Sequence, residues 1–528
     1  MRIAPSVRHR VARVAAALLL SSALPAAVLA QTGGTAAPAT MTIHADQPGP
    51  RVNRQIFSQF AEHLGHGIYG GIWVGRGSKI PNVDGYRRDV LDALRELKVP
   101  AIRWPGGCFA DEYHWRDGIG PAAKRPVKIN THWGSVAETN AFGTHEYMGL
   151  LDRLGAQAYV SGNVGDGSPA EMADWVEYMT SPSGSTLARQ RAANGHPAPW
   201  TLPYVGIGNE LWGCGGNMRA DYGADVTRRY ATFVKPPAGQ TIRKIASGPN
   251  TDDYHWTEVM MREAGKQIDG LSLHYYTFPG SWEHKGSATG FAEHEWASTL
   301  AHTLRMDDLL TRHAAIMDTY DPAKRVWLVV DEWGTWYDVE RGTNSGFLYQ
   351  QNSLRDALVA AINLNIFVRH ADRVKMTAIA QMVNVLQAML LTDGARMVRT
   401  PTYWVFDLYK PWQDATALPI ELSSPYYDKD EFAMPAVSAS AVRDTAGQVH
   451  VGLANLDPHR PQTVTIRLAG LTATQVGGTI LTAPAMDTVN TFDRPDGVVP
   501  TAFTGATVSG DTLSVALPPK SVVVLDLR

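Results

Sequence analysis

Short apolar runs alternate with longer amphipathic stretches from about residue 52 to residue 410, and this alternation limits the folds open to the chain. Segments such as YRRDVLDALREL (86–97) and SPAEMADWVEYM (168–179) repeat apolar residues at helical spacing. Strands that alternate with helices form parallel sheets, and eight such units favour a closed (β/α)8 TIM barrel over an open doubly wound sheet. The eight strand candidates are QIFSQFAEH (55–63), VPAIRWPGG (99–107), QAYVSGNVG (157–165), YVGIGNE (204–210), TIRKIASGPN (241–250), IDGLSLHYYT (268–277), RVWLVVDEW (325–333) and KMTAIAQMVNV (375–385).

The C-terminal part of the chain has a different pattern. Runs such as QTVTIRLAG (462–470) and SVVVLDLR (521–528) alternate apolar and polar residues between Gly, Asp and Pro turns, which predicts an all-β, jelly-roll-like sandwich. We therefore expect a catalytic barrel over residues 52–415 and a β-sandwich over 416–528. Residues 31–51 form a lead-in whose strand-like ATMTIHAD (39–46) is compatible with pairing into the sandwich.

The first 30 residues have the pattern of a secretory signal. Four arginines precede the apolar run VAAALLLSSALPAAVLA (14–30), which ends in small and apolar residues. An uncleaved membrane anchor is the alternative, but Pro25 and the shortness of the run disfavour a stable span. We therefore expect a signal peptide over residues 1–30 and an exported protein, periplasmic or extracellular, that is soluble after cleavage.

The charge balance and the known short motifs exclude several classes of function. The formal net charge is −3, so neither nucleic acid nor an anionic membrane is expected as a partner, whereas a homo-oligomer is compatible with the sequence. The segment GHGIYG (65–70) fits GxGxxG, but the glycine-broken sequence after it cannot open the helix that would hold a dinucleotide. His–Glu pairs occur without the HExxH spacing of a zinc site. We expect no cofactor and no metal.

Polar residues stand where the predicted barrel strands end. The carboxyl ends of barrel strands meet at one mouth, where active sites form. The residues at these ends are Glu62 and His63 on the first strand, Arg103 on the second, Asn163 on the third, Asn209 and Glu210 on the fourth, His274 and Tyr276 on the sixth, Asp331 and Glu332 on the seventh, and Gln381 on the eighth.

Glu210 and Glu332 lie far apart in sequence, but the predicted barrel places them on opposite sides of the same mouth. Two carboxylates that flank a glycosidic bond are what its hydrolysis needs, because one protonates the leaving oxygen while the other attacks the sugar or activates water. We expect Arg103 and Tyr276 to keep one carboxylate ionised, and Asn209 to donate to a sugar hydroxyl. Trp104, Trp212, Trp333 and Trp336 lie near the same strand ends, and aromatic faces suit the C–H faces of sugars.

Six motifs in order resemble the α-L-arabinofuranosidases of glycoside hydrolase family 51: FAEHLGHGIYGGIW, RWPGGCFADEYHWRDGIGP, RAANGHPAPW, GIGNELWGCGG, SLHYYT and VDEWGTWY. The resemblance runs from about residue 42 to the C-terminus. It implies a retaining hydrolase with Glu210 as general acid/base and Glu332 as nucleophile. It also implies contacts from the arabinofuranosyl ring to Glu62, Cys108, Asn209, Tyr276 and Gln381, although family members often have asparagine at position 108.

Cys108 and Cys214 are the only cysteines, and both follow predicted barrel strands at the mouth. We predict a disulfide between them that braces the rim of the active site. The alternative is two buried thiols that fill space.

The sequence therefore predicts a retaining, exo-acting α-L-arabinofuranosidase that releases terminal arabinofuranosyl residues from arabinose-containing polysaccharides or oligosaccharides. We expect the long aromatic segment TFPGSWEHKGSATGFAEHEW (277–296) to line the leaving-group side. Two alternatives stay open at this point: another retaining glycosidase on the same barrel, such as a β-xylosidase or an endoglucanase, and a non-catalytic carbohydrate-binding protein.

Overall fold

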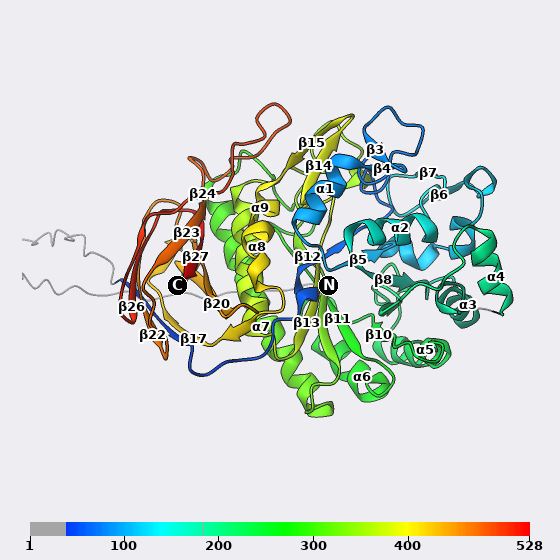
Figure 1. The fold of residues 1–528 in the computed structure, drawn as a ribbon, viewed down its shortest axis with the longest axis horizontal. Helices are drawn as coiled ribbons and strands as arrows, with labels where there is room; N and C mark the ends of the chain where they lie inside the picture. Colours follow the sequence, from blue (N-terminus) through cyan, green and yellow to red (C-terminus); the bar gives the residue numbers. More distant parts are fainter. Residues whose placement is uncertain (1–37, 183) are drawn as a thin grey trace, which may run out of the picture. The chain divides into compact units, whose positions relative to one another are not determined.

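The computed structural model describes residues 38–182 and 184–528 (Figure 1). The predicted signal peptide, residues 1–30, lies outside the described residues. Within the described ranges, no helix combines the length and apolar character needed to cross a membrane.

Eight parallel strands close into a barrel, which confirms the predicted TIM barrel. Each predicted apolar run overlaps one of them, and the last strand pairs with the first to close the ring. The barrel strands are β2 (Ser58–Phe60), β5 (Ala101–Trp104), β8 (Gln157–Gly162), β9 (Tyr204–Ile207), β10 (Arg243–Ala246), β11 (Gly270–Thr277), β12 (Trp327–Thr335) and β13 (Val374–Ile379).

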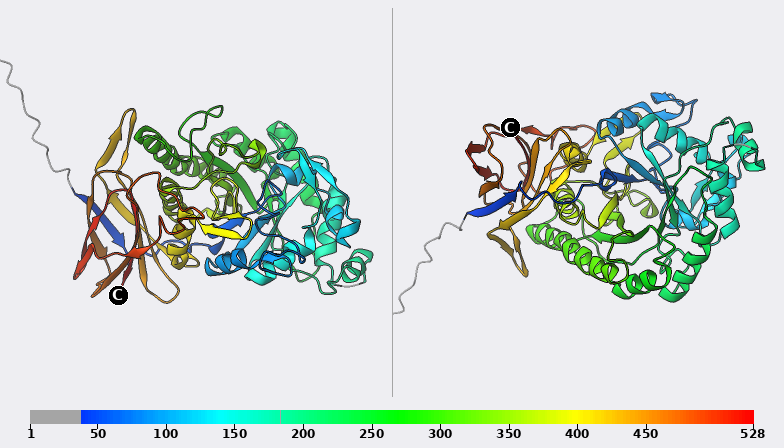
Figure 2. Two further views of the ribbon diagram at one scale, coloured as in Figure 1. Left: turned by 90° about the horizontal axis from the view of Figure 1, so that it is seen from above. Right: turned by 60° about the horizontal axis from the view of Figure 1, so that its bottom comes forward.

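Helices cover the outside of the barrel, as Figure 2 shows. They begin where the sequence supplies caps: the Ser168 side chain accepts a hydrogen bond from Glu171 N at 3.1 Å, and Pro169 occupies the first turn of α3. The helices are α1 (Arg88–Glu96), α2 (Thr144–Leu154), α3 (Pro169–Thr180), α4 (Thr186–Ala193), α5 (Ala220–Phe233), α6 (Tyr254–Ala264), α7 (Glu293–Tyr320), α8 (Leu354–Arg369) and α9 (Pro401–Leu408).

Helix α8 is buried on every side. Its sequence LRDALVAAINLNIFVR is apolar around nearly the whole circumference, which is typical of a helix enclosed by protein. It packs against β12 of the barrel and against strands of the sandwich, and Figure 1 shows it between the two. Its polar residue Asn365 is satisfied there, because Oδ1 accepts from Ser440 Oγ at 2.6 Å and from Tyr409 Oη at 3.0 Å.

Two antiparallel-rich sheets form the C-terminal sandwich. Their inner faces enclose a separate apolar core that includes Val451, Ile466 and Leu525. The N-terminal strand β1 joins this module, parallel to β22 and antiparallel to β17. One sheet has the order β17 (Ile420–Ser423), β1 (Ala39–His44), β22 (Gln462–Ala469), β26 (Thr512–Leu517), β25 (Ala506–Ser509); the other has β16 (Thr416–Leu418), β20 (Val437–Arg443), β21 (Val449–Asn455), β27 (Ser521–Leu527), β23 (Val476–Leu481), β24 (Thr501–Ala502).

Insertions between barrel strands and helices shape the mouth of the barrel. A hairpin follows β5 and carries Trp133 at its turn, and the connection from β11 to α7 carries Trp282. The four hairpins outside the main sheets are β3 (Asn82–Val83) with β4 (Tyr86–Arg87), β6 (Lys128–Asn130) with β7 (Val136–Glu138), β14 (Leu390–Asp393) with β15 (Arg396–Arg399), and β18 (Tyr426–Lys429) with β19 (Phe432–Pro435).

Candidate active site

Glu210 and Glu332 face one another at the barrel mouth. Each offers a carboxylate oxygen to a group with His274 whose atoms all lie within 4.8 Å of one another. Both glutamates line one narrow pocket together with Glu62 and Gln381. The fold therefore brings together two carboxylates that are more than 100 residues apart in the chain.

Hydrogen-bond donors surround Glu332 on β12. Arg103 Nη1 donates to Oε1 at 2.7 Å, and Tyr276 Oη donates to Oε2 at 2.8 Å. Gly107 makes room for this carboxylate, because a Cβ at that position would lie 2.7 Å from Oε1. Both carboxylate oxygens of Glu332 therefore accept hydrogen bonds, one from a guanidinium and one from a phenol.

Glu210 has a more apolar environment just after β9. Burial raises its pKa, the charge of Glu332 acts in the same direction, and the hydrogen bond with His274 opposes them. Its backbone adopts φ +40°, in the left-handed region, and the preceding Gly208 has φ +76°. The chain thus turns sharply at the end of the strand and directs the carboxyl group toward the pocket.

His274 on β11 links three acidic groups. Its Nδ1 lies 2.8 Å from Glu210 Oε1 and 3.6 Å from Glu332 Oε2, and its Nε2 lies 3.2 Å from Asp331 Oδ1. Burial alone lowers the pKa of His274, but the neighbouring carboxylates outweigh it and raise the pKa to about 10. His274 thus forms an ion-pair network with all three acids.

Asp331 is among the polar residues predicted at the strand ends, but the sequence assigns it no role. It precedes Glu332 on β12 and would face away from the barrel interior in a regular strand. The register between β12 and β13 shifts between Val330 and Trp333, and such irregularities re-aim side chains. Asp331 Oδ2 therefore accepts from Tyr159 Oη at 2.6 Å and lies 3.5 Å from Arg103 Nε.

Glu62 also lines the narrow pocket. Its Oε1 accepts from Gly107 N, Phe109 N and Trp133 Nε1 at 2.9 to 3.1 Å, and its Oε2 accepts from Gln381 Nε2 at 3.0 Å. Burial and the charge of Glu332 raise the pKa of Glu62 to about 7. The buried Oε1 of Gln381 has no hydrogen-bond partner within the described chain, so it is available to a ligand hydroxyl.

Asn209 and Arg103 lie behind the two catalytic candidates. Arg103 Nη2 donates to Asn209 Oδ1 at 2.6 Å, which fixes the amide orientation. Asp111, a residue that the sequence reasoning missed, accepts the backbone N–H groups of Asn209 at 2.9 Å and Val164 at 2.8 Å. Arg103 contacts Glu332 and Asn209, both of which are predicted site residues. It does not line the narrow pocket, nor the second pocket beside Glu210 that is described below.

A disulfide joins Cys108 and Cys214, which confirms the predicted pairing, with Cα atoms 5.5 Å apart. Its sulfurs lie 4.0 and 3.6 Å from Glu210 Oε2. A disulfide carries no S–H, so these are van der Waals contacts. They give Glu210 an apolar neighbour on the side where Cys108 lines the pocket.

A second pocket of about 560 Å³ adjoins the first, and both are lined by Glu210, Tyr276 and Trp336. Trp282 and Phe278, from the connection after β11, line its wall. The Trp282 side chain is 55% exposed, with its ring centroid 5.2 Å from that of Trp336.

Two of the four predicted sugar-facing tryptophans are core residues instead. Trp104 is fully buried and stacks on Tyr147 at 4.8 Å, and Trp333 is fully buried against Phe367. Each follows an inward-facing residue on its strand, so alternation turns its side chain outward, beneath the surrounding helices. Trp212 and Trp336 do line the second pocket.

A (β/α)8 barrel that holds two carboxylates across one pocket, with donors around one and apolar contacts around the other, defines a glycoside hydrolase. Comparisons with known proteins specify the family. The α-L-arabinofuranosidase 1 domain matches residues 93–290, and the α-L-arabinofuranosidase C-terminal domain matches residues 331–521.

Individual relatives cover nearly the whole chain. The intracellular exo-α-L-arabinofuranosidase of Bacteroides ovatus is 49% identical over 97% of this chain and 100% of its own length. The intracellular exo-α-(1→5)-L-arabinofuranosidase of Streptomyces lividans is 30% identical over 89% of this chain and 72% of its own length. The crystal structure of the GH51 arabinofuranosidase from Xanthomonas axonopodis pv. citri has a TM-score of 0.92 and 62% identity, over 93% of this chain and 100% of that one.

The chain belongs to the α-L-arabinofuranosidases of glycoside hydrolase family 51. It is an exo-acting α-L-arabinofuranosidase, and the xylosidase, endoglucanase and non-catalytic alternatives are not favoured.

The predicted export of the protein is wrong. The relatives from Bacteroides ovatus and Streptomyces lividans are both named intracellular enzymes, which contradicts the expected export. The prediction rested on the arginines and the apolar run of the first 30 residues alone. Such a pattern is set by short-range composition and is independent of the fold and chemistry of the remaining chain.

Proposed function

We propose that Glu332 is the nucleophile and Glu210 the general acid/base of a double-displacement hydrolysis. The observation that carries this proposal is the facing pair of carboxylates, with oxygens within 4.8 Å of one another. Retaining glycosidases hold their two carboxyl groups about 5 to 5.5 Å apart, whereas inverting enzymes leave room for a water at about 6.5 to 9.5 Å.

In the first step a Glu332 carboxylate oxygen forms a bond to the anomeric carbon while the bond to the glycosidic oxygen breaks. Glu210 gives its proton to that oxygen, and the leaving group departs as an alcohol. In the second step Glu210, now ionised, takes a proton from water. The water oxygen bonds to the anomeric carbon, Glu332 is released as a carboxylate, and arabinose leaves with its configuration retained.

The two environments support this division of roles. Arg103 and Tyr276 donate to Glu332, so its charge is available for attack and is stabilised again when the sugar departs. Burial beside the disulfide keeps Glu210 protonated to higher pH than a solvated glutamate, as a general acid requires. The His274 imidazolium bridges the pair.

We propose that the arabinofuranosyl ring occupies the narrow pocket. Glu62 and Gln381 have acceptor oxygens there for ring hydroxyls, Asn209 has an amide group beside the nucleophile, and the disulfide sulfur of Cys108 forms part of the wall. The larger adjoining pocket then receives the remainder of the substrate between Trp212, Trp282 and Trp336.

We further propose that the substrates are arabinose-containing oligosaccharides with α-(1→5) linkages among them. The Streptomyces lividans relative is named for that linkage, and an intracellular enzyme meets fragments of a polysaccharide rather than the intact polymer. Residues 52–415 then act as the catalytic domain, and residues 416–528 with β1 as a supporting domain.

Azide rescue of two alanine variants distinguishes the two roles. Glu332→Ala leaves room for azide on the nucleophile's side, so it should form an arabinofuranosyl azide of inverted configuration. Glu210→Ala should accumulate the glycosyl-enzyme with an activated aryl substrate, and azide should release it as the azide of retained configuration. The same product configuration from both variants would contradict the assignment. Asp331→Asn serves as the matched control for loss of an acid at the site and should form no azide product.

A further inference from the structure

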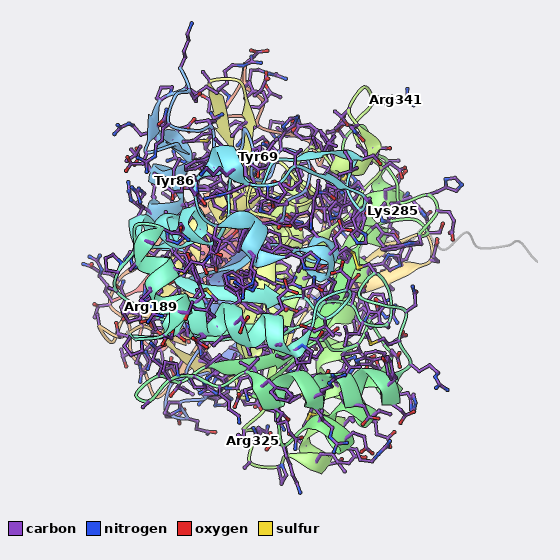
Figure 3. All side chains as sticks on the ribbon, turned by 90° about the vertical axis from the view of Figure 1, so that its right-hand side faces the viewer. Tyr69, Tyr86, Arg189, Lys285, Arg325 and Arg341 are labelled. Atoms are coloured by element: carbon purple, nitrogen blue, oxygen red, sulfur yellow. A yellow bond between two sulfur atoms is a disulfide. The ribbon has the colours of Figure 1, made fainter. Side chains whose placement is uncertain are left out.

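A cavity of about 800 Å³ lies away from the catalytic carboxylates. It is bounded by α2, by the segment from Trp73 to Tyr86 around β3 and β4, by residues 120–125, and by residues 194–200 after α4. None of its lining residues lines either active-site pocket. In Figure 3, Tyr86 lies on the same side of the view as Arg189 of α4, across from Lys285, whose ammonium lies over the rings of Trp282 and Trp336.

This cavity accounts for a motif that the active site does not use. The sequence RAANGHPAPW spans residues 191–200, and four of its residues line the cavity: Asn194, Gly195, His196 and Trp200. Arg191 holds residues 194–200 in place, because its guanidinium donates to the backbone carbonyls of Tyr178 at 2.7 Å and Pro197 at 3.0 Å.

Aromatic rings form much of the cavity wall. Trp73 lies edge-on to Tyr86 with ring centroids 4.9 Å apart, and His196 stacks on Trp200 at 4.2 Å. Trp73 and His196 are half-buried, so their rings are accessible from the cavity. Such faces suit the apolar C–H faces of sugars.

One buried polar group at this cavity has no partner. Trp200 is only 6% exposed, and its indole N–H makes no hydrogen bond within residues 38–182 and 184–528. A buried donor without an acceptor is costly, and a ligand that supplies an acceptor to Trp200 would remove that cost. A sugar hydroxyl or ring oxygen is an acceptor of the required kind.

The charges of the lining balance. Three arginines face three acids: Arg125 pairs with Glu146 at 3.0 Å, Arg153 pairs with Asp84, and Arg76 and Asp152 complete the set. Burial lowers the pKa of His145 to about 4, so this histidine is neutral. A lining without net charge gives no preference to phosphorylated or acidic ligands.

We propose that this cavity is a second, non-catalytic carbohydrate site that binds a neutral arabinofuranosyl oligosaccharide. This proposal rests on the proposed substrate class of the enzyme. An enzyme that hydrolyses arabinofuranosyl glycans meets a neutral, hydroxyl-rich ligand in another part of the same glycan. Its volume is within the range of about 300 to 1,000 Å³ that ligand sites occupy. A chain held there raises the local concentration of chain ends at the catalytic mouth.

Calorimetric titration with an α-(1→5)-linked arabinofuranosyl tetrasaccharide tests the proposal, in a Glu332→Ala background that leaves the ligand intact. We expect two binding events per chain. Trp200→Phe, which removes the N–H, and Trp73→Ala should each weaken one event at least about tenfold and leave the other unchanged. Trp404→Phe is the matched control, because the indole N–H of Trp404 is also buried and unpartnered in the described chain but lies against Tyr403, outside this cavity.

The outcomes separate the two proposals. A single event that neither variant changes would overturn the second site and leave the catalytic proposal intact. No binding at all would contradict the substrate class and the second site together. If Trp200→Phe does not fold, Trp73→Ala alone decides. Concentration-dependent self-association that Trp73→Ala abolishes, without a second binding event, would show that another copy of the chain covers the cavity and would also overturn the proposal.

Discussion

Replacing Tyr276 by phenylalanine removes one hydrogen bond to the proposed nucleophile and leaves the ring in place. The Tyr276 hydroxyl donates to Glu332 Oε2 at 2.8 Å, and the other oxygen keeps its 2.7 Å contact with Arg103. During the second step Glu332 regains its negative charge as the sugar departs, so this hydrogen bond strengthens toward that transition state. A hydrogen bond to a charged group contributes about 1.5 to 3 kcal/mol, which corresponds to a roughly 10- to 150-fold slower second step.

Steady-state and stopped-flow kinetics with an activated aryl α-L-arabinofuranoside measure this effect. The first step is fast with such a leaving group, so the glycosyl-enzyme should accumulate in Tyr276→Phe. We expect kcat and KM to fall together, with a burst of aryl alcohol equal to the enzyme concentration. An unchanged kcat with a raised KM would refute the reasoning, because it would mean that Tyr276 only binds substrate.

Three further predictions follow from the same site. Arabinobiose has a poor leaving group, a second arabinose, so loss of its hydrolysis at high pH reports ionisation of Glu210. His274→Gln removes a cation that lowers the pKa of Glu210, so the alkaline limb of the pH profile should move to higher pH. A move to lower pH would contradict the network. The disulfide closes a sequence separation of 106 residues, for which the loop-entropy model gives an upper bound of about 5 kcal/mol; reductant should lower the Tm of the wild type and leave Cys108→Ser/Cys214→Ser unchanged. Trp282→Ala should raise KM for arabinobiose and not for methyl α-L-arabinofuranoside, and equal effects on both would exclude a leaving-group contact.

The barrel and its paired carboxylates could be predicted from sequence because both depend on short-range pattern. Each apolar run is of strand length, and Glu210 and Glu332 stand where their runs end. Strict alternation along a strand also places Trp104 and Trp333 outside the barrel, since Arg103 and Glu332 face inward. Side-chain alternation therefore predicts that these two tryptophans are core residues rather than sugar-facing ones.

The remaining site residues depend on tertiary structure. Asp331 reaches Arg103 and His274 only because the register of β12 shifts, and no residue pattern marks that shift. Trp133 reaches Glu62 from a hairpin 71 positions away in sequence. Asp111 accepts hydrogen bonds from backbone N–H groups, which every residue type except proline possesses, so no side-chain pattern marks its partners.

Identification of the covalent intermediate tests the central claim most directly. A mechanism-based arabinofuranosyl inhibitor is incubated with the enzyme, and the labelled peptide is fragmented and sequenced by mass spectrometry. The proposed mechanism predicts a single arabinofuranosyl ester on Glu332. A label on Glu210, Glu62 or the adjacent Asp331 would contradict the assignment of the nucleophile, and a product of inverted configuration without any label would contradict double displacement itself.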